Sequence, residues 1–238
     1  MPASSPYAQP DRETARDALT SRGWLAQQPS QFQTLLLETG RILRVETRDT
    51  LTLEGDDDLR IFGLVSGSIS CLISHRHSIP KLATIIAPGR WFGMGPRLIG
   101  GNRTISFVAA EPAVVLWFGA SELGRIEAAW PDLNQRIGQL AQINSNYIAQ
   151  IVSELLIPQA QRRILAVLVR LCEGREGMIN LALSQSDLAE MANASRATVN
   201  ATLKQLERAD LLAISYNALK IPCAAKLEQH LDAGEDKD

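Results

Sequence analysis

The sequence predicts an α+β fold, in which a jelly roll of short strands precedes a long helix and a winged helix-turn-helix. Between residues 40 and 118, short apolar runs alternate with turn residues at regular spacing, which is typical of a sandwich or jelly roll. From about residue 121 onward, apolar residues recur at helical spacing instead. Residues 184–221 then carry two capped helical segments and a short hairpin. Strands that come first and helices that follow indicate the α+β class.

Length and composition indicate two domains and no membrane span. At 238 residues the chain suits two domains better than one, and its 45% hydrophobic content is enough for real cores. The longest apolar run near the middle, Ile164–Val169, is far shorter than the ~20 residues of a spanning helix. The three cysteines, Cys71, Cys172 and Cys223, are widely scattered, so we expect reduced thiols and a cytoplasmic location.

The chain divides into four predicted segments. Residues 1–21 are rich in proline, serine and charge and predict a flexible arm. Residues 22–131 predict the strand domain, residues 132–157 a long helix, and residues 158–238 the C-terminal domain and tail. A short helix is expected from Gly23 into Phe32, and the acidic run Asp56–Asp58 is expected to be a solvated turn. The expected strands are Arg41–Val45, Thr50–Leu53, Arg60–Val65, Ile69–Ser74, Leu82–Ile86, Thr104–Ala109 and Val114–Phe118.

The helix over residues 132–157 carries two apolar rows. The first row follows a three-four alternation, which is typical of the seam of a two-stranded coiled coil, and predicts a homodimer. Its members are Ile137, Leu140, Asn144, Tyr147 and Ile151. The second row is expected to pack back onto the strand domain, and consists of Ile143, Ile148, Val152 and Leu155. The competing interpretation is a central helix buried within one domain. A hinge is expected near Leu156–Pro158, because proline ends one helix or opens the next.

Residues 184–208 predict two helices joined by a tight turn. Ser184 and Asp187 have the spacing of a capping pair, and Ser195 has the position of a second cap. Asn193 lies where the chain must reverse, and asparagine tolerates a left-handed backbone. The buried positions of the second helix are expected to be Val199, Leu203 and Leu206. A hairpin over residues 211–221, with Asn217 in its turn, follows directly and indicates a wing.

This arrangement predicts a surface that enters the DNA major groove. The candidate DNA-binding residues lie at the two helix starts and along the second helix: Ser184, Gln185, Ser195, Arg196, Ala197, Thr198, Asn200 and Lys204. The net charge of −2 decides nothing, because a sequence-specific DNA-binding protein needs only a local basic face. The competing interpretation is an ordinary helical hairpin in a larger core.

The order of these segments resembles the cyclic-AMP receptor protein / fumarate-nitrate regulator (CRP/FNR) family from about residue 22 to 222. The most specific matching motifs are Ile61–Ile69, Pro88–Gly93, Arg103-Thr104 and Ser195–Val199. The resemblance implies a cyclic-nucleotide-binding-like jelly roll, a dimerisation helix and a DNA-binding transcription regulator. Its expected partners are double-stranded DNA and a second copy of the chain, with RNA polymerase as a further candidate and no membrane.

The resemblance also implies a ligand pocket. In the family's nucleotide binders, the segment that corresponds to Phe92–Ser106 holds the cyclic phosphate, and Gly93, Arg103 and Thr104 match its glycine, arginine and small or hydroxyl-bearing residue. Those binders have a glutamate where this chain has Met94, and polar adenine contacts near Ile148. We therefore expect no cofactor and weak cyclic AMP binding. Arg103 is then expected to serve another, more apolar anion, or to pair with an acid such as Glu111 in a ligand-independent dimer.

Two other functions compete with this interpretation. One is a conventional cyclic-AMP-activated regulator. The other is a metal-dependent, cupin-like enzyme with an appended helical domain, because His75 and His77 would point to one face of a strand. Such a site needs a nearby carboxylate and a further histidine, and the only remaining histidine is His230 in the tail. No residues form a credible nucleophile–base set, so we expect no enzyme, no catalytic residues and no metal.

Overall fold

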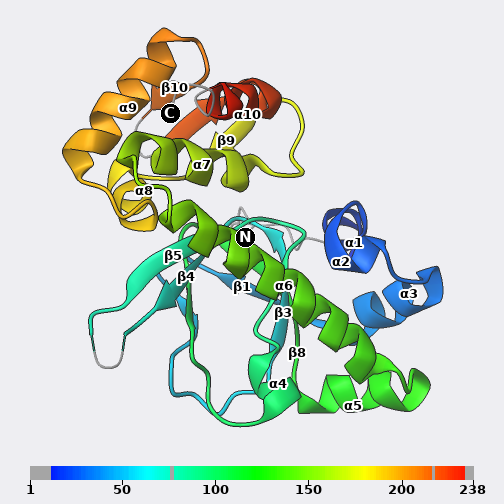
Figure 1. Ribbon diagram of the computed structural model, residues 1–238. Helices are drawn as coiled ribbons and strands as arrows, with labels where there is room; N and C mark the ends of the chain where they lie inside the picture. Colours follow the sequence, from blue (N-terminus) through cyan, green and yellow to red (C-terminus); the bar gives the residue numbers. More distant parts are fainter. Residues whose placement is uncertain (1–11, 76–77, 216–217, 234–238) are drawn as a thin grey trace, which may run out of the picture.

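The computed structural model describes residues 12–75, 78–215 and 218–233. Its lower half in Figure 1 is the predicted jelly roll, which consists of two four-stranded antiparallel sheets. The first sheet has the order β1 (Arg41–Val45), β8 (Ala113–Phe118), β3 (Ile61–Ser66) and β6 (Trp91–Phe92). The second has the order β2 (Thr50–Thr52), β7 (Ser106–Ala109), β4 (Ile69–Ile73) and β5 (Lys81–Ile86). All seven predicted strands are therefore present, and β6 is an addition.

The core of the jelly roll lies between the two sheets. Phe62 of β3 stacks on Phe92 of β6 with ring centroids 5.3 Å apart, and Phe107 of β7 meets Phe92 from the opposite sheet at 4.7 Å. After Lys81, strand β5 alternates buried and half-buried side chains, as a strand with one face more deeply covered should. Strand β3 is buried on both faces, because α1 (Arg12–Thr20) covers its outer side.

Part of the predicted flexible arm is folded, so the expectation of an arm over residues 1–21 is wrong for residues 12–21. Ala15 and Leu19 lie one helical turn apart on α1, and both are buried against the strand domain. Arg12 donates to the carbonyls of Leu37 and Glu38, at the C-terminal end of α3 (Ser30–Thr39). Cations stabilise the negative end of a helix. The helix expected from Gly23 is split into α2 (Gly23–Ala26) and α3.

Helix α4 (Gly95–Ile99) lies within the jelly roll, between β6 and β7. Two further helices connect the jelly roll to the C-terminal part of the chain: α5 (Ala120–Ala129) and the long α6 (Leu133–Leu155), which crosses the strand domain diagonally in Figure 1. Helix α7 begins at Ala160, so the helices break within residues 156–159, where the sequence predicts a hinge.

The C-terminal domain is a small helical unit with a three-stranded sheet. It comprises α7 (Ala160–Cys172), β9 (Ile179–Leu181), α8 (Gln185–Met191), α9 (Arg196–Arg208), β10 (Ala213–Ser215), β11 (Ala218–Ile221) and α10 (Ala224–Asp232). The sheet has the order β10-β11-β9. The expected hairpin is present, whereas β9 and α10 are additions to the prediction; the turn residue Asn217 lies outside the described residues.

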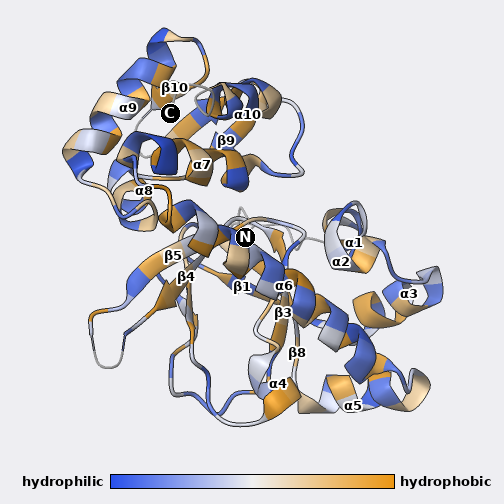
Figure 2. Cartoon of the chain, in the orientation of Figure 1, coloured by the Kyte–Doolittle hydropathy of each residue, from blue (hydrophilic) through white to orange (hydrophobic). Residues whose placement is uncertain are grey.

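The burial of the two apolar rows of α6 differs from the prediction. Ile137 and Leu140 of the predicted dimer seam are each only 2% exposed, because Trp24, Trp91 and Phe118 of this same chain cover them. The row expected to pack onto the strands is instead open, with Ile148 53% and Val152 51% exposed. In Figure 2 the visible side of α6 mixes apolar and polar residues along its length. The seam prediction is therefore wrong for the buried row.

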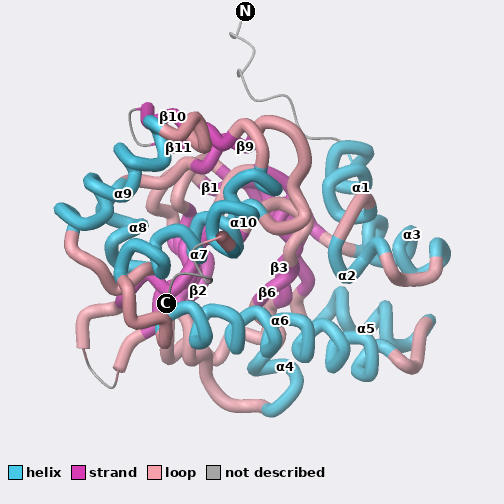
Figure 3. The backbone as a smooth tube through the Cα atoms, turned by 45° about the horizontal axis from the view of Figure 1, so that its top comes forward, coloured by secondary structure: helices cyan, strands magenta, loops and turns pink. Residues whose placement is uncertain are grey.

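The C-terminal domain is docked on the strand domain. Helix α8 packs against β5, and Leu82 of β5 is part of the apolar core of the C-terminal domain. The backbone N–H of Leu82 donates to Glu190 Oε1 on α8 at 2.9 Å. Figure 3, seen from a direction tilted by 45°, again shows α8 beside the strand domain and α9 on the outer side. Among the described residues, no helix has the length and apolar composition that a bilayer crossing requires.

Candidate nucleic-acid interface and ligand cavity

Both helices of the helix-turn-helix begin at the predicted caps. Ser184 Oγ accepts from the Asp187 N–H at 3.1 Å, and the Asp187 carboxylate accepts from the Ser184 N–H at 3.0 Å. Ser195 Oγ accepts from the Thr198 N–H at 3.0 Å and lies 2.8 Å from the Thr198 hydroxyl. These bonds satisfy amides that a helix start leaves without partners. Both predicted helix starts are therefore confirmed.

The turn between the helices has the predicted backbone. Asn193 has a φ of +45°, in the left-handed region that asparagine tolerates. The next N–H, that of Ala194, bonds to the carbonyl of Ala189 at 2.9 Å. On α9, Val199 and Leu203 are fully buried and Leu206 is 3% exposed, as predicted. The side of α9 opposite these buried residues is therefore its outer face.

That outer face of α9 is polar and open. Arg196 and Lys204 are exposed and Asn200 is half-buried, four residues apart in each step. Residues at this spacing lie along one side of a helix. Ala197 and Ala201 are exposed beside them and keep the backbone of α9 accessible. Within the described residues, Arg196 makes no hydrogen bond or ion pair.

The remaining predicted contacts gather around the start of α9. A surface depression next to Arg196 is bordered by the start of α8, through Ser184 and Gln185, and by the wing residues Ser215 and Ala218. Two helix N-termini, one arginine and a wing therefore meet at one surface. Helix N-termini and arginine both favour a bound anion such as a phosphate.

A second feature is a cavity of about 440 Å³ between the second sheet and α6. Its walls are mainly apolar, and they include Cys71, whose pKa burial raises to about 12, so that the thiol stays protonated. All five residues expected from the ligand motif lie in its wall: Gly93, Met94, Arg103, Thr104 and Ile148. The exposed row of α6 forms one side of its mouth.

Arg103 is bound by its own chain. Nη1 donates to the Gly93 carbonyl at 3.0 Å, Nη2 donates to the Arg60 carbonyl at 2.6 Å, and Nη2 lies 3.4 Å from an oxygen of Asp58. Burial lowers the pKa of the Arg103 guanidinium, and the Asp58 carboxylate acts in the opposite direction. The predicted acid, Glu111, lies elsewhere, in the wall of a smaller cavity at the domain junction.

The acidic run is therefore more than a solvated turn. Asp58 accepts from Arg60 Nε at 2.8 Å and contacts Arg103, and a wide loop returns it to the strand domain. The sequence contains three adjacent aspartates and does not indicate which of them faces the protein interior. Only the placement of Arg60 and Arg103 beside the loop distinguishes Asp58.

Asn144 and Tyr147, two members of the predicted helix seam, make hydrogen bonds within this chain. Asn144 Nδ2 donates to the Trp91 carbonyl at 3.0 Å and lies 3.5 Å from the sulfur of Met94. The Tyr147 hydroxyl lies 3.1 Å from the Thr84 hydroxyl on β5. Ile151, the last member of the predicted seam, is half-buried in the cavity wall. Asn144 and Tyr147 thus fasten α6 to the strand domain.

The histidine pair expected as a metal candidate is described only in part. His75 is exposed after β4, and His77 lies outside the described residues. Across the described ranges, no group of three His, Cys, Asp or Glu side chains lies close enough together to hold a metal ion. All three cysteines are free thiols.

Comparison with known proteins matches both halves of the chain. A sequence profile described as the Crp-like helix-turn-helix domain matches residues 162–230. The cAMP-activated global transcriptional regulator CRP of Pasteurella multocida (strain Pm70) is 23% identical over 178 residues, covering 72% of this chain and 85% of that protein. This relative is a transcription regulator rather than an enzyme.

Two solved structures show the same fold over most of both chains. FixK2 from Bradyrhizobium japonicum superposes with a TM-score of 0.69 at 14% identity, covering 80% of this chain and 96% of that one. A putative cyclic nucleotide binding protein from Ruegeria pomeroyi has a TM-score of 0.68 at 15% identity, with coverage of 93% and 99%. Residues 162–230 thus match a Crp-like helix-turn-helix domain, and with the jelly roll before it the chain is similar to DNA-binding transcription regulators of the CRP/FNR type.

Proposed function

We propose that the chain acts as a homodimer that reads a two-fold DNA site with α9. The observation that carries this proposal is the exposed row of Arg196, Asn200 and Lys204 on a helix whose opposite side is fully buried. A helix with one such face, beside a wing, has the shape that enters a major groove. Working on DNA, the protein would reside in the cytoplasm.

Each residue of the interface has a proposed role. Arg196 reads a base, most simply the O6 and N7 of a guanine. Lys204 and the two capped helix starts at Ser184 and Ser195 contact phosphate, because their amides and charges carry no base information. Gln185, Thr198 and Asn200 lie close enough to the same surface to contact bases or sugars.

The preferred site should differ from the familiar family consensus. The resemblance aligns the family's further base readers, a glutamate and an arginine, with Ala197 and Ala201. An alanine offers only a methyl group, which suits the methyl of a thymine and not a hydrogen-bonded base pair. We therefore propose a different operator sequence, read chiefly by Arg196.

The dimer surface that we propose is the exposed row of α6. Ile148, Val152 and Leu155 are 42–53% exposed along one side of the helix, whereas Ile143, 39% exposed, lies farther round it. A contiguous exposed apolar row of this kind marks an association surface, and a second copy would pair it with itself. The row also borders the cavity mouth, so a partner helix there would close the cavity.

The cavity does not suit cyclic AMP. A cyclic phosphate needs the Arg103 guanidinium, which already holds two carbonyls and faces Asp58. The ribose hydroxyl would meet Met94, and the base would meet Ile148. Each buried polar group without a partner costs ~1–3 kcal/mol, so we propose that cyclic AMP neither binds well nor switches DNA affinity.

Two regulatory states remain compatible with this cavity. In the first, the dimer binds DNA without any effector, because both terminal nitrogens of Arg103 are already bonded within the chain. In the second, a mostly apolar effector fills the cavity, and the volume of about 440 Å³ and the apolar walls favour this state. RNA polymerase is the proposed protein partner in either state, because a transcription regulator acts through it.

Selection of bound fragments from a random DNA pool tests the proposed function. We expect enrichment of a two-fold site whose half-sites lie about one helical turn, ~34 Å, apart. Binding should weaken steeply with salt, since phosphate contacts release counterions. Tight binding of such a site by a protein that stays monomeric at micromolar concentration would contradict the dimer. No enrichment at low salt would contradict DNA binding, and metal analysis would test the enzyme alternative.

A further inference from the structure

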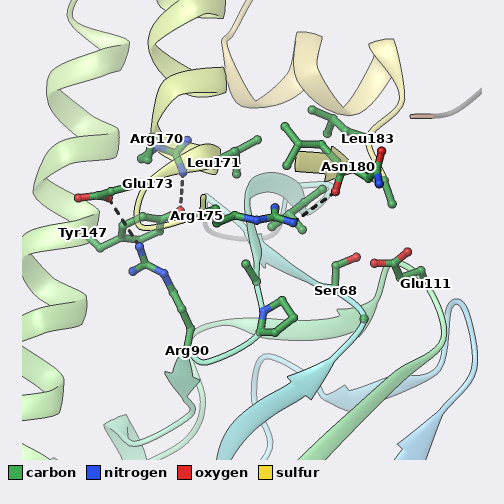
Figure 4. Close-up of a pocket in the computed structure, with 16 residues that line it drawn as sticks. Ser68, Arg90, Glu111, Tyr147, Arg170, Leu171, Glu173, Arg175, Asn180 and Leu183 are labelled. Atoms are coloured by element: carbon green, nitrogen blue, oxygen red, sulfur yellow. Dashed lines mark hydrogen bonds and ion pairs between the residues drawn. The ribbon is translucent and has the colours of Figure 1, made fainter. Parts of the chain in front are cut away.

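Arg170 of α7 lies at the junction of the two domains and is fully enclosed. Its Nε donates to both oxygens of Glu154 on α6 at 2.8 Å. Its Nη1 donates to the Thr84 hydroxyl on β5 at 2.8 Å and to the Tyr147 hydroxyl on α6 at 2.7 Å. Figure 4 shows Arg170 above Tyr147, with the bond between them dashed. One side chain of the C-terminal domain therefore binds both the strand domain and the long helix.

Tyr147 is held from two sides at this junction. Arg90 of the strand domain lies over its ring, with the guanidinium carbon 3.9 Å from the ring centroid. Arg90 also reaches towards Glu173, just beyond α7, at 3.8 Å. A cation over an aromatic face is attracted to it. The position of the Tyr147 hydroxyl is thus set by contacts with both domains.

The same two hydroxyl-bearing residues belong to the cavity. Thr84 and Tyr147 line the 440 Å³ cavity, whereas Arg170 lies behind them and is not part of its wall. Each hydroxyl has one proton to donate and can accept from Arg170. One of the two protons is shared between the hydroxyls at 3.1 Å, and within this network the other proton has no acceptor. An occupant of the cavity that carries a hydrogen-bond acceptor would meet that proton.

We propose that an occupant of the cavity controls the position of the DNA-binding domain through the Thr84–Tyr147 hydroxyl pair, to which Arg170 donates. We call this hydroxyl pair, with Arg170, the joint. This inference rests on the proposed function in that the C-terminal domain binds DNA. It also names the chemistry of the effector: a mostly apolar molecule with one hydrogen-bond acceptor at the end that faces β5. Such an acceptor completes the hydroxyl network and strengthens the hold on Arg170, because donor chains polarise one another.

The cost of burying the Arg170 guanidinium explains why the two hydroxyls stabilise the docked arrangement of the domains. A guanidinium enclosed in protein is costly unless its donors are used. Burial raises the pKa of the Glu154 carboxyl, and the Arg170 guanidinium acts against that shift. The two hydroxyls supply the remaining acceptors for Nη1. Nη2 of Arg170 is already buried without a hydrogen-bond partner, so removing the hydroxyls leaves both terminal nitrogens without an acceptor in the docked arrangement.

Hydrogen exchange at the Leu82 amide reports docking without DNA or ligand. This N–H donates across the domain boundary to Glu190. Tyr147→Phe and Thr84→Val each remove one hydroxyl and keep the side-chain shape, so both variants should fold. We expect each to speed exchange at Leu82 at least about tenfold, since a hydrogen bond to a charged group is worth that much. Ser145→Ala is the matched control: it removes a hydroxyl from the same cavity wall but not from the joint.

Hydrogen exchange at Leu82 and DNA affinity together distinguish a failure of the joint from a failure of the proposed function. Unchanged Leu82 exchange in the Thr84→Val/Tyr147→Phe double variant would overturn the joint. Faster exchange with unaltered affinity for the selected DNA site would overturn its control of DNA binding. Faster exchange in a protein whose native form binds no DNA would leave the joint in place and refute the proposed function. Faster exchange with an altered DNA affinity, and neither change in Ser145→Ala, supports the proposal.

Discussion

The key arginines at the two ends of the molecule differ in burial and in their bonds to the rest of the chain. Arg103 in the cavity wall is 4% exposed and is bound by two carbonyls and Asp58 of its own chain. Arg196 at the start of α9 is exposed and has no such partner within the described residues. An arginine without internal partners is available to an external anion, whereas a partnered one must first give up its bonds. The DNA-binding end is therefore open, whereas at the cavity end both terminal nitrogens of Arg103 are bonded without a ligand and its buried Nε has no hydrogen-bond partner.

The largest effect should come from Arg103. Arg103→Met keeps the apolar stem but leaves the Gly93 and Arg60 carbonyls without their side-chain donor and removes the ion pair with Asp58, which keeps its bond from Arg60. We expect the free energy of unfolding to fall by about 2–4 kcal/mol, since each buried acceptor left unsatisfied is costly. Urea denaturation measures this loss. Arg196→Met is the matched control and should leave unfolding unchanged; equal losses in both variants would refute the contrast between the two arginines.

A change on the outside of α6 tests association while leaving both arginines in place. Ile148→Glu puts a charge into the middle of the exposed row, where a second copy would bury it. We expect dimer dissociation to rise at least about a hundredfold, because an unpaired buried charge is strongly unfavourable. Analytical ultracentrifugation measures the change. Gln142→Glu places the same charge on α6 away from the row, and an equal effect there would argue against this dimer surface.

At the open end, Arg196→Ala should affect DNA recognition alone. We expect a loss of ~1–3 kcal/mol in binding and relaxed preference at one position in each half-site. Lys204→Ala should instead weaken binding to all DNA sequences alike. It should also reduce the slope of the logarithm of the binding constant against the logarithm of salt concentration by about 1. Fluorescence anisotropy with the selected site and single-base variants measures both. A sequence-independent loss in Arg196→Ala would assign that side chain to phosphate.

The smallest expected effect concerns Asn144. Asn144→Leu removes the bond to the Trp91 carbonyl and should lower unfolding stability by about 1 kcal/mol. Dimer association should stay the same, because Asn144 faces the strand domain. A change in association without a change in stability would restore the coiled-coil assignment of this residue.

Local signals made the DNA-binding end predictable. The caps at Ser184 and Ser195 act within three residues, and the left-handed turn at Asn193 depends on one side chain. The buried row of α9 follows from helical spacing alone. The exposed face, and with it the candidate DNA contacts, could therefore be predicted without any knowledge of the rest of the fold.

The sensor half was harder to predict because distant residues decide it. Both rows of α6 are apolar, and their orientation is set by Trp24 and Trp91, which lie far away in the sequence. The partner of Arg103 is chosen among several acids by how the loop at Asp58 folds back. Helix α1 was not predicted for the same reason, because Ala15 and Leu19 are only a short apolar pair within a charged segment. Arg170 was placed on a helix correctly, but its three partner residues are contributed by two other elements.

The most direct test of the contrast between the two ends is a DNA-binding titration with and without cyclic AMP. The selected DNA site is labelled and the protein is titrated at fixed salt, in the absence and presence of cyclic AMP at physiological concentration. Because Arg103 is held internally and Arg196 is open, we predict the same dissociation constant under both conditions. A dissociation constant that falls about tenfold or more with cyclic AMP, and no longer falls in Arg103→Met, would contradict this account.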